Sequence, residues 1–311
     1  MNTILFASTH VRNTADWLDA FRAALPGFEF VPWDDSGTTV GAELAIVWNP
    51  PAALLQREPQ VRALFNLAAG VDALLSVPGL SPEMHIFRLE DAGMAPQMIE
   101  YAVHALLQQS RDFSRYARQQ RQCQWLPHPT IRRIGWPVGV LGMGLMGQGV
   151  ARAIAGLGYP VAGWSRSPKN IPGIESFAGL PALNAFLART RVLINVLPLT
   201  AETRGILNRD TFARLLPDAH VINVGRGGHL AEEDLIPALD DGLLSGATLD
   251  VFQVEPLPAD HPFWCDERIV ITPHVAADTV LQDAVEQVAA KIRCYLDGGM
   301  PSGQVVLENG Y

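Results

Sequence analysis

The chain has 311 residues, of which 48% are hydrophobic and 18% are charged, and its formal net charge is −9. This composition is typical of a folded globular protein, because a disordered chain is poorer in apolar residues and richer in charge. The acidic excess and the lack of any cluster of Lys and Arg argue against nucleic acid as a partner, since phosphate binding requires a positive surface.

The N-terminal residues and the cysteines narrow the class of protein further. The apolar run Ile4–Ala7 lacks the basic flank and the length of a secretory signal, and no apolar stretch reaches the roughly 18 residues that span a bilayer. Cys123, Cys265 and Cys294 are widely spaced, so we expect free thiols rather than a disulfide or a metal site. We therefore expect a cytoplasmic protein that has no membrane partner.

In chain order, the first hundred residues alternate short apolar runs with a helical pattern. Thr3–Ser8, Leu44–Trp48 and Arg62–Ala68 are predicted strands, and the spacing of apolar residues in Thr14–Leu25 predicts a helix. This alternation is typical of βαβ units, so we predict a small α/β domain with a parallel sheet.

One long amphipathic segment follows, from Pro96 to about Gln120. Its first half is apolar and its second half is polar and basic. We predict a single helix that leaves the first domain and packs on the next.

A second alternating series then predicts a further α/β domain, which agrees with the two domains of about 100–200 residues usual for this length. A last helix is predicted from Thr279 to about Leu296. The predicted strands are Val138–Leu141, Val161–Trp164, Val192–Val196, His220–Val224, Gly246–Leu249 and Ile269–Ile271.

The first strand of this series leads into a glycine motif, Gly142-x-Gly144-x-x-Gly147, and a helical pattern follows it. In that context the first glycine allows a tight turn and the second lets a pyrophosphate approach the backbone. The third lets helix and strand pack closely, and the helix N-terminus supplies amides to the phosphates. The motif therefore predicts a dinucleotide site.

The end of the next strand selects between the two nicotinamide coenzymes. An NAD-dependent enzyme places an acidic residue about 20 residues after the motif, against the ribose hydroxyls. Here the stretch is Ser165-Arg166-Ser167-Pro168-Lys169, which has no acid. A guanidinium can hold a 2′-phosphate in a charge-assisted pair, and the hydroxyls add donors. We therefore expect NADPH, with NADH as a weaker alternative.

Three chemically capable residues follow three successive predicted strands: Arg226, Glu255 and His274. The carboxyl edge of a parallel sheet is where open α/β folds bind ligands. Arg226 could bind a carboxylate, and His274 could donate or accept a proton. Glu255 could stabilise the imidazolium form of His274 and so raise the pKa of that histidine. Each alone has an ordinary structural explanation, but the three together after a dinucleotide motif favour catalysis.

The motifs resemble those of the D-isomer-specific 2-hydroxyacid dehydrogenase family. The resemblance rests on NLAAGVD at residues 66–72 and on GMGLMG, NVGRGG, LDVFQVEPLP and TPHVA between residues 138 and 276. Three further segments are similar to the glyoxylate/hydroxypyruvate reductase A group of that family: FRLEDAGMAPQMIEYAV, RVLINVLPLTAETRGIL and the C-terminal GQVVLENGY.

This resemblance implies an α/β architecture of two Rossmann-like domains with parallel sheets and a cleft between them. Residues 1–97 and 281–311 would form a flavodoxin-like substrate and catalytic domain, to which the last helix returns. Residues 98–280 would form the NAD(P)-binding domain. The family also implies a homodimer built through the coenzyme domains.

The resemblance also implies roles for individual residues. His274 would be the acid/base, Glu255 its partner, and Arg226 the group that orients the 2-oxoacid. The substrate would also contact the backbone of Ala69 and Gly70. Trp48 matches a position near the substrate, and Trp125 lies in a segment that in related reductases can reach the active site of the neighbouring subunit. A place in the core is the alternative for each tryptophan. The remaining coenzyme contacts, beside the glycines and Ser165 to Lys169, would come from Leu145, Met146, Leu197, Pro198, Thr203, Val224 and Asp250.

The reaction implied is NADPH-dependent reduction of glyoxylate to glycolate and of hydroxypyruvate to D-glycerate. Two alternatives stay open. One is reduction of a bulkier 2-oxoacid by the same machinery. The other is a nucleotide-sensing binding protein, similar to the C-terminal-binding corepressors that share the fold. Formate dehydrogenases pair the histidine with an amide side chain, and Glu255 argues against that activity.

Overall fold

The computed structural model describes residues 2–34 and 36–307, and the chain folds as two compact units. Unit 1 lies within Met1–Met94 and Thr279–Tyr311, and unit 2 is Ala95–Asp278. The boundaries expected from the resemblance fall at 97/98 and 280/281. The last four residues of the C-terminal GQVVLENGY segment lie outside the described residues.

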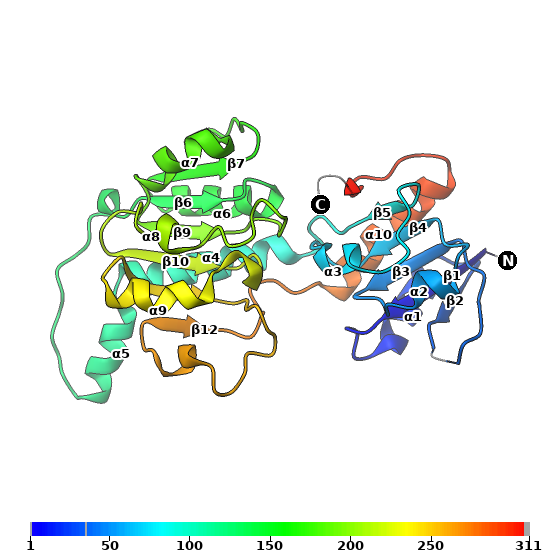
Figure 1. The fold of residues 1–311 in the computed structure, drawn as a ribbon, viewed down its shortest axis with the longest axis horizontal. Coiled ribbons are helices and arrows are strands. Elements are labelled where there is room, and N and C mark those ends of the chain that lie inside the picture. Colours follow the sequence, from blue (N-terminus) through cyan, green and yellow to red (C-terminus); the bar gives the residue numbers. More distant parts are fainter. Residues whose placement is uncertain (1, 35, 308–311) are drawn as a thin grey trace. The chain divides into compact units, whose positions relative to one another are not determined.

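Unit 1 is built on a parallel sheet of five strands in the order β2-β1-β3-β4-β5. The central strands are almost wholly apolar because both of their faces are buried; Ile46 pairs with Phe6 on one side and Phe65 on the other. Helix α10 belongs to this unit and packs against α1 (Figure 1). The elements are β1 (Asn2–Ser8), α1 (Thr14–Ala24), β2 (Phe28–Pro32), β3 (Leu44–Trp48), α2 (Leu54–Arg57), β4 (Ala63–Asn66), α3 (Asp72–Leu75), β5 (His85–Phe87) and α10 (Leu281–Leu296).

Unit 2 is built on a parallel sheet of seven strands in the order β12-β11-β10-β9-β6-β7-β8. The strand order reverses beside β6, which creates the switch point at which doubly wound sheets bind ligands. Its strands are β6 (Val138–Leu141), β7 (Val161–Ser165), β8 (Glu175–Ala178), β9 (Val192–Asn195), β10 (Ala219–Asn223), β11 (Leu244–Leu249) and β12 (Ile269–Ile271). Its helices are α4 (Met94–Ser110), α5 (Phe113–Arg121), η1 (Arg133–Gly135), α6 (Leu145–Gly156), α7 (Gly179–Leu187), α8 (Arg209–Phe212), η2 (Gly227–His229), α9 (Glu232–Asp240) and η3 (Pro262–Cys265).

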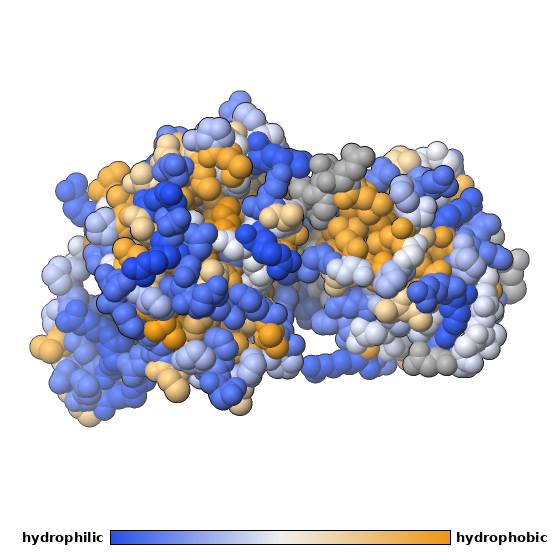
Figure 2. Space-filling model, viewed as in Figure 1, coloured by the Kyte–Doolittle hydropathy of each residue, from blue (hydrophilic) through white to orange (hydrophobic). Residues whose placement is uncertain are grey.

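The single helix predicted over Pro96–Gln120 is wrong, because the segment forms two helices, α4 and α5. Asp112 adopts a left-handed conformation with φ of +53°, which interrupts the helical hydrogen bonds. Its N–H donates to the carbonyl oxygen of Gln109. Helix α4 supplies Ala102, Ala105 and Leu106 to the core of unit 2. The residues of α5 itself are mostly hydrophilic, and its region of the surface is mostly blue in Figure 2.

Three strands have no counterpart in the sequence prediction: β2, β5 and β8. Each lies at the edge of its sheet, and β2 and β8 are only partly buried. An edge strand needs no continuous apolar run, so its sequence carries a weak signal. The other predicted strands are confirmed, although β4 is shorter than the predicted Arg62–Ala68. Among the helices of the described residues, none is long and apolar enough to cross a membrane.

Candidate active site

The glycine motif occupies the turn between β6 and α6, at the switch point of the sheet. Gly142 has a φ of +98°, and a Cβ added there would lie 2.9 Å from the carbonyl oxygen of Val196. A Cβ at Gly147 would lie 1.8 Å from the carbonyl oxygen of Gly142, so this glycine sets the contact between helix and strand. The local geometry predicted for the first and third glycines is confirmed.

Gly144 is the glycine of the motif that is exposed to solvent. It caps the N-terminus of α6, and nothing lies within 4 Å of a Cβ added there. Leu145 is exposed and Met146 partly exposed beside it. An open backbone at a helix N-terminus fits a pyrophosphate, because its N–H groups and the helix dipole both favour an anion.

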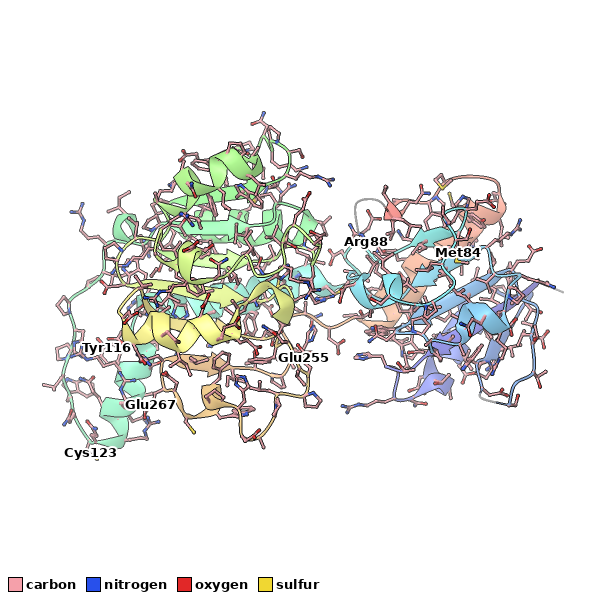
Figure 3. The ribbon with its side chains drawn as sticks, in the orientation of Figure 1. Met84, Arg88, Tyr116, Cys123, Glu255 and Glu267 are labelled. Atoms are coloured by element: carbon pink, nitrogen blue, oxygen red, sulfur yellow. The ribbon has the colours of Figure 1, made fainter. Side chains whose placement is uncertain are left out.

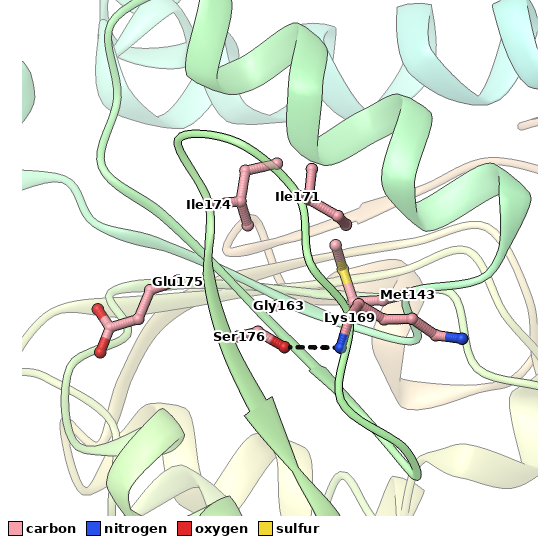
Figure 4. Close-up of a pocket in the computed structure, with 7 residues that line it drawn as sticks. All are labelled: Met143, Gly163, Lys169, Ile171, Ile174, Glu175 and Ser176. Atoms are coloured by element: carbon pink, nitrogen blue, oxygen red, sulfur yellow. Dashed lines mark hydrogen bonds between the residues drawn. The ribbon is translucent and has the colours of Figure 1, made fainter.

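The segment after β7 carries two cations near that turn. Arg166 and Ser167 are exposed, and Lys169 is partly exposed, with its backbone N–H donating to Ser176 Oγ at 3.1 Å. Figure 4 shows the Lys169 side chain directed away from Glu175. Ser165 is buried and its hydroxyl donates to the carbonyl oxygen of Ser167 at 2.8 Å, so Ser165 holds the loop, and donation to a phosphate would break that bond.

The loop after β9 forms a second wall next to β6. Asn195 Oδ1 accepts from the Leu197 N–H at 3.3 Å, and the Thr203 hydroxyl donates to the Pro198 carbonyl oxygen at 2.7 Å. Pro198 is exposed whereas Leu197, Thr203 and Val224 are buried. The contacts predicted between these residues and the coenzyme stay predictions.

His274 and Glu255 form a hydrogen-bonded pair of titratable side chains. His274 Nδ1 lies 2.7 Å from Glu255 Oε2, and Glu255 Oε1 accepts from the Phe252 N–H at 2.9 Å. The bond to Glu255 raises the pKa of His274, aided by the negative charge and opposed by burial and by the charge of Arg226. Burial alone would raise the pKa of Glu255, but the bonds from His274 and Phe252 outweigh it and lower that pKa. Glu255 is therefore the anionic partner of His274, and His274 stays protonated to a higher pH than an ordinary histidine, as the sequence predicts.

Asp250 holds the backbone that carries His274. This buried carboxylate accepts hydrogen bonds from Thr272 Oγ1 at 2.6 Å and from the N–H groups of Val275 and Ala276, each at 2.8 Å. Its carbonyl oxygen accepts from the His274 N–H at 2.8 Å. His274 has a φ of +57°, a conformation that costs a non-glycine residue about 1–2 kcal/mol. These four bonds stabilise that conformation, and the predicted contact of Asp250 with nicotinamide stays a prediction.

Tyr101 extends this network into α4. Its hydroxyl lies 2.6 Å from Thr272 Oγ1, and burial raises its pKa to about 12. Because Thr272 donates to Asp250, the hydrogen between the two hydroxyls comes from Tyr101. Sequence reasoning missed Tyr101 and Thr272. Thr272 follows β12 two residues before the histidine, but a tyrosine within an apolar helix gives no signal.

Arg226 lies beyond β10 between two glycines that allow close packing. A Cβ at Gly227 would lie 1.8 Å from the carbonyl carbon of Phe252, so the Arg226 segment lies directly against the segment that leads to Glu255. The guanidinium donates to the Gly225 carbonyl oxygen at 2.7 Å, and its charge acts on the pKa values of both Glu255 and His274. The structure thus brings Arg226, Glu255 and His274 together at one edge of unit 2; Glu255 is labelled there in Figure 3.

The predicted substrate residues of unit 1 lie at the carboxyl ends of β3 and β4. Trp48 ends β3 and is partly exposed, with its ring centroid 4.6 Å from that of His10 and 5.9 Å from that of Trp17. Ala69 and Gly70 follow β4, where Asn66 Nδ2 donates to the Gly70 carbonyl oxygen at 2.8 Å. Trp48 thus packs in an aromatic cluster of its own unit, and its contact with substrate stays a prediction.

Trp125 lies in the segment after α5 and is 96% exposed. It borders a groove of about 570 Å³ with Tyr116 and Leu126. Cys123, two residues before Trp125, and Tyr116 of α5 lie across the width of unit 2 from Glu255 (Figure 3). Trp125 therefore does not join the site of its own chain.

Comparison with known proteins places this geometry in a family. A family model described as the NAD binding domain of D-isomer specific 2-hydroxyacid dehydrogenases matches residues 103–276. The chain belongs to this 2-hydroxyacid dehydrogenase family. The family predicted from the motifs is confirmed, and so is the architecture of two α/β units with parallel sheets.

Relatives of this dehydrogenase cover nearly its whole length. It is 44% identical to glyoxylate/hydroxypyruvate reductase A of Serratia proteamaculans over 96% of this chain and 97% of that protein. A crystal structure of a family member from Xanthobacter autotrophicus Py2, in complex with NADPH and MES, has a TM-score of 0.93 at 36% identity, covering 100% and 99% of the two chains. The NADPH-dependent glyoxylate/hydroxypyruvate reductase of Sinorhizobium meliloti, in complex with NADP and sulfate, has a TM-score of 0.93 at 32% identity, covering 100% of both chains.

Proposed function

We propose that this dehydrogenase uses NADPH to reduce small 2-oxoacids, converting glyoxylate to glycolate and hydroxypyruvate to D-glycerate. The observation that carries the proposal is the His274–Glu255 pair at 2.7 Å, set beside Arg226 at the edge that also carries the dinucleotide turn. The relatives named glyoxylate/hydroxypyruvate reductase A support the choice of substrates.

The protein residues supply the proton and the charge that this reduction requires. NADPH, when bound, supplies the hydride. His274 Nδ1 is engaged by Glu255, so Nε2 is the ring nitrogen that donates the proton to the developing alkoxide. Arg226 binds the carboxylate of the 2-oxoacid and stabilises negative charge on the carbonyl oxygen.

The segment after β7 favours NADPH over NADH. It carries Arg166 and Lys169 and has no carboxylate that would repel a 2′-phosphate. The exposed Arg166 binds that phosphate, and Lys169 adds positive charge. NADH binds more weakly because it offers no such partner. Structural neighbours that contain NADPH or NADP support this assignment.

A homodimer and a cytoplasmic location complete the proposal. The exposure of Trp125, together with the separation of its neighbour Cys123 from Glu255 in Figure 3, favours contact with a second copy of the chain. We propose that the copies associate through the coenzyme units and that Trp125 approaches the partner's substrate.

Replacing His274 tests the proposed chemistry. His274→Ala removes the proton donor but leaves the glycine turn intact, so turnover of glyoxylate with NADPH falls by roughly 10²–10⁴-fold. Binding of NADPH, followed by its fluorescence, changes little. His104→Ala, at an exposed histidine of α4, is the control and retains wild-type turnover. Near wild-type turnover of His274→Ala would show that His274 is not the acid.

A further inference from the structure

A network of buried side chains outside the predicted set surrounds the backbone of Arg226. Asn195 and Asn223 are the last residues of the neighbouring strands β9 and β10, and His229 ends the short helix η2. All three side chains are buried, with 0% of their surface exposed. Buried polar groups are costly unless they are hydrogen-bonded, so their partners show what they hold in place.

The two asparagines hold the carbonyl side of Arg226. Asn195 Nδ2 donates to Asn223 Oδ1 at 2.9 Å, and Asn223 Nδ2 donates to the Arg226 carbonyl oxygen at 3.1 Å. The N–H of Gly225 also donates to Asn223 Oδ1, at 3.2 Å. Because the two amides join the ends of adjacent strands, the start of the Arg226 segment is fixed to the sheet.

His229 holds the other side of Arg226. The Arg226 N–H donates to His229 Nδ1 at 3.0 Å, and His229 Nε2 lies 3.2 Å from the Pro198 carbonyl oxygen. These contacts favour one tautomer. With the hydrogen on Nε2, Nδ1 accepts from Arg226 and Nε2 donates to Pro198. With the hydrogen on Nδ1, that nitrogen could donate to the Arg226 carbonyl oxygen at 3.1 Å, but the Arg226 N–H would lose its acceptor and Nε2 would face an oxygen with no hydrogen between them. The Nε2–H tautomer therefore makes two of these bonds and the Nδ1–H tautomer makes one.

Gly225, the residue before Arg226, packs closely against the same network. A Cβ added at Gly225 would lie 2.9 Å from Asn195 Nδ2 and 3.1 Å from the His229 ring. Glycine therefore lets the backbone lie directly on the amide and the imidazole. A segment packed so closely leaves the guanidinium on a backbone with little freedom to shift.

We propose that His229, as the neutral Nε2–H tautomer, is a positioning residue. It holds the Arg226 backbone so that the guanidinium meets the carboxylate of the 2-oxoacid. It also links Arg226 to Pro198 in the loop after β9, which is predicted to contact the coenzyme. This proposal rests on the proposed function for the role of Arg226. The link to Pro198 is one of two, since Thr203 Oγ1 also donates to that carbonyl oxygen at 2.7 Å. Loss of His229 therefore affects the 2-oxoacid more than NADPH.

His220 provides a matched control. It lies in the same unit at the other end of β10, is 3% exposed, and has Nε2 2.9 Å from Thr248 Oγ1. His229→Phe and His220→Phe each replace a buried imidazole by a ring of similar size and each break hydrogen bonds. A purely structural role for His229 predicts similar behaviour of the two variants.

The kinetic test compares KM for glyoxylate with the Kd of NADPH. His229→Phe raises KM for glyoxylate at least about tenfold, because small displacements of an orienting group are costly, and changes the Kd of NADPH less than about threefold. His229→Asn recovers most of the KM, since its Oδ1 can accept from the Arg226 N–H. His220→Phe leaves KM within about twofold. An unchanged KM in a folded His229→Phe, or equal losses of substrate and coenzyme binding, would overturn the proposal.

A second measurement on the wild-type protein does not depend on turnover or on folding of a variant. Long-range ¹H–¹⁵N correlation spectra of the histidine rings, assigned by His229→Asn, report which ring nitrogen carries the hydrogen. The expected result is Nε2–H, and Nδ1–H or a doubly protonated ring at neutral pH would overturn the assignment. Nε2–H without turnover of any 2-oxoacid would refute the proposed function and leave the assignment of His229 standing.

Discussion

At the scale of single residues, the candidate catalytic side chains could be predicted, but the hydrogen bonds that hold their backbone in place could not. Arg226, Glu255 and His274 each follow an apolar strand, and parallel strands bring such positions to one edge. The contact of Asp250 with nicotinamide stays a prediction, and the structure adds that its carboxylate accepts from the N–H groups of Val275 and Ala276, directly after His274. These hydrogen bonds depend on the left-handed conformation of His274, which no sequence pattern predicts.

The Glu255 carboxylate determines the pH range in which His274 works. Its hydrogen bond to Nδ1, aided by its negative charge, raises the pKa of His274, so the protonated donor persists at higher pH. Reductive turnover falls as pH rises through that pKa. In Glu255→Gln the charge is gone while the Phe252 N–H keeps an acceptor, and the fall in turnover moves to lower pH. The measurement is kcat against pH under conditions where deuterated NADPH slows turnover.

Glu267→Gln is the control for this prediction. Glu267 is an exposed glutamate of the same unit, well separated from Glu255 in Figure 3, and its removal leaves the profile in place. An inflection that stays at the wild-type pH in Glu255→Gln would show that Glu255 does not govern the proton on His274.

At the scale of elements, buried strands were predicted well, but three of the four edge strands of the described residues were missed and only β12 was predicted. Five of the six predicted strands of unit 2 lie inside the sheet and are almost wholly buried, so their sequences are mainly apolar. The break between α4 and α5 escaped prediction because Asp112 is a residue that helices also accept, and only its left-handed φ ends α4. Strand order is set by pairing between distant segments, which a local pattern does not report.

The contact between β6 and α6 gives a test of the glycine motif. Gly147→Ala places a Cβ against the Gly142 carbonyl oxygen and forces the helix away from the turn, at a cost of about 1–3 kcal/mol in unfolding free energy. The Kd of NADPH, measured by fluorescence, rises at least about tenfold, because a displaced helix N-terminus no longer meets the pyrophosphate.

Gly156→Ala in the same helix is the matched control. Nothing lies within 4 Å of a Cβ at Gly156, so this change leaves NADPH binding intact and stabilises the fold by about 0.4–1 kcal/mol. Equal NADPH affinities for the two variants would contradict the role assigned to the turn.

At the scale of the whole molecule, a buried histidine couples stability to pH. Burial lowers the pKa of His220 to about 4, below its ordinary value of 6.5. Between these values the unfolded chain binds more protons than the folded one, so the free energy of unfolding decreases as pH falls from 6.5 toward 4. The contribution of this group is on the order of 3 kcal/mol, from 1.36 kcal/mol per pH unit.

Replacing His220 removes that contribution to acid sensitivity. In His220→Gln, the midpoint of thermal unfolding falls less between pH 6.5 and pH 4.5 than in the wild type. His104→Gln, at an exposed histidine, follows the wild-type curve. Parallel curves for His220→Gln and the wild type would show that His220 titrates normally in the folded protein.

We propose that this 2-hydroxyacid dehydrogenase is an NADPH-dependent reductase of small 2-oxoacids. The most direct measurement is kcat/KM for glyoxylate and hydroxypyruvate, followed by absorbance decay with NADPH and again with NADH. We predict rapid turnover of both substrates with NADPH and much slower turnover with NADH. Turnover that is faster with NADH would contradict the phosphate-binding role of Arg166, and no turnover of either acid with either coenzyme would contradict the proposed reaction.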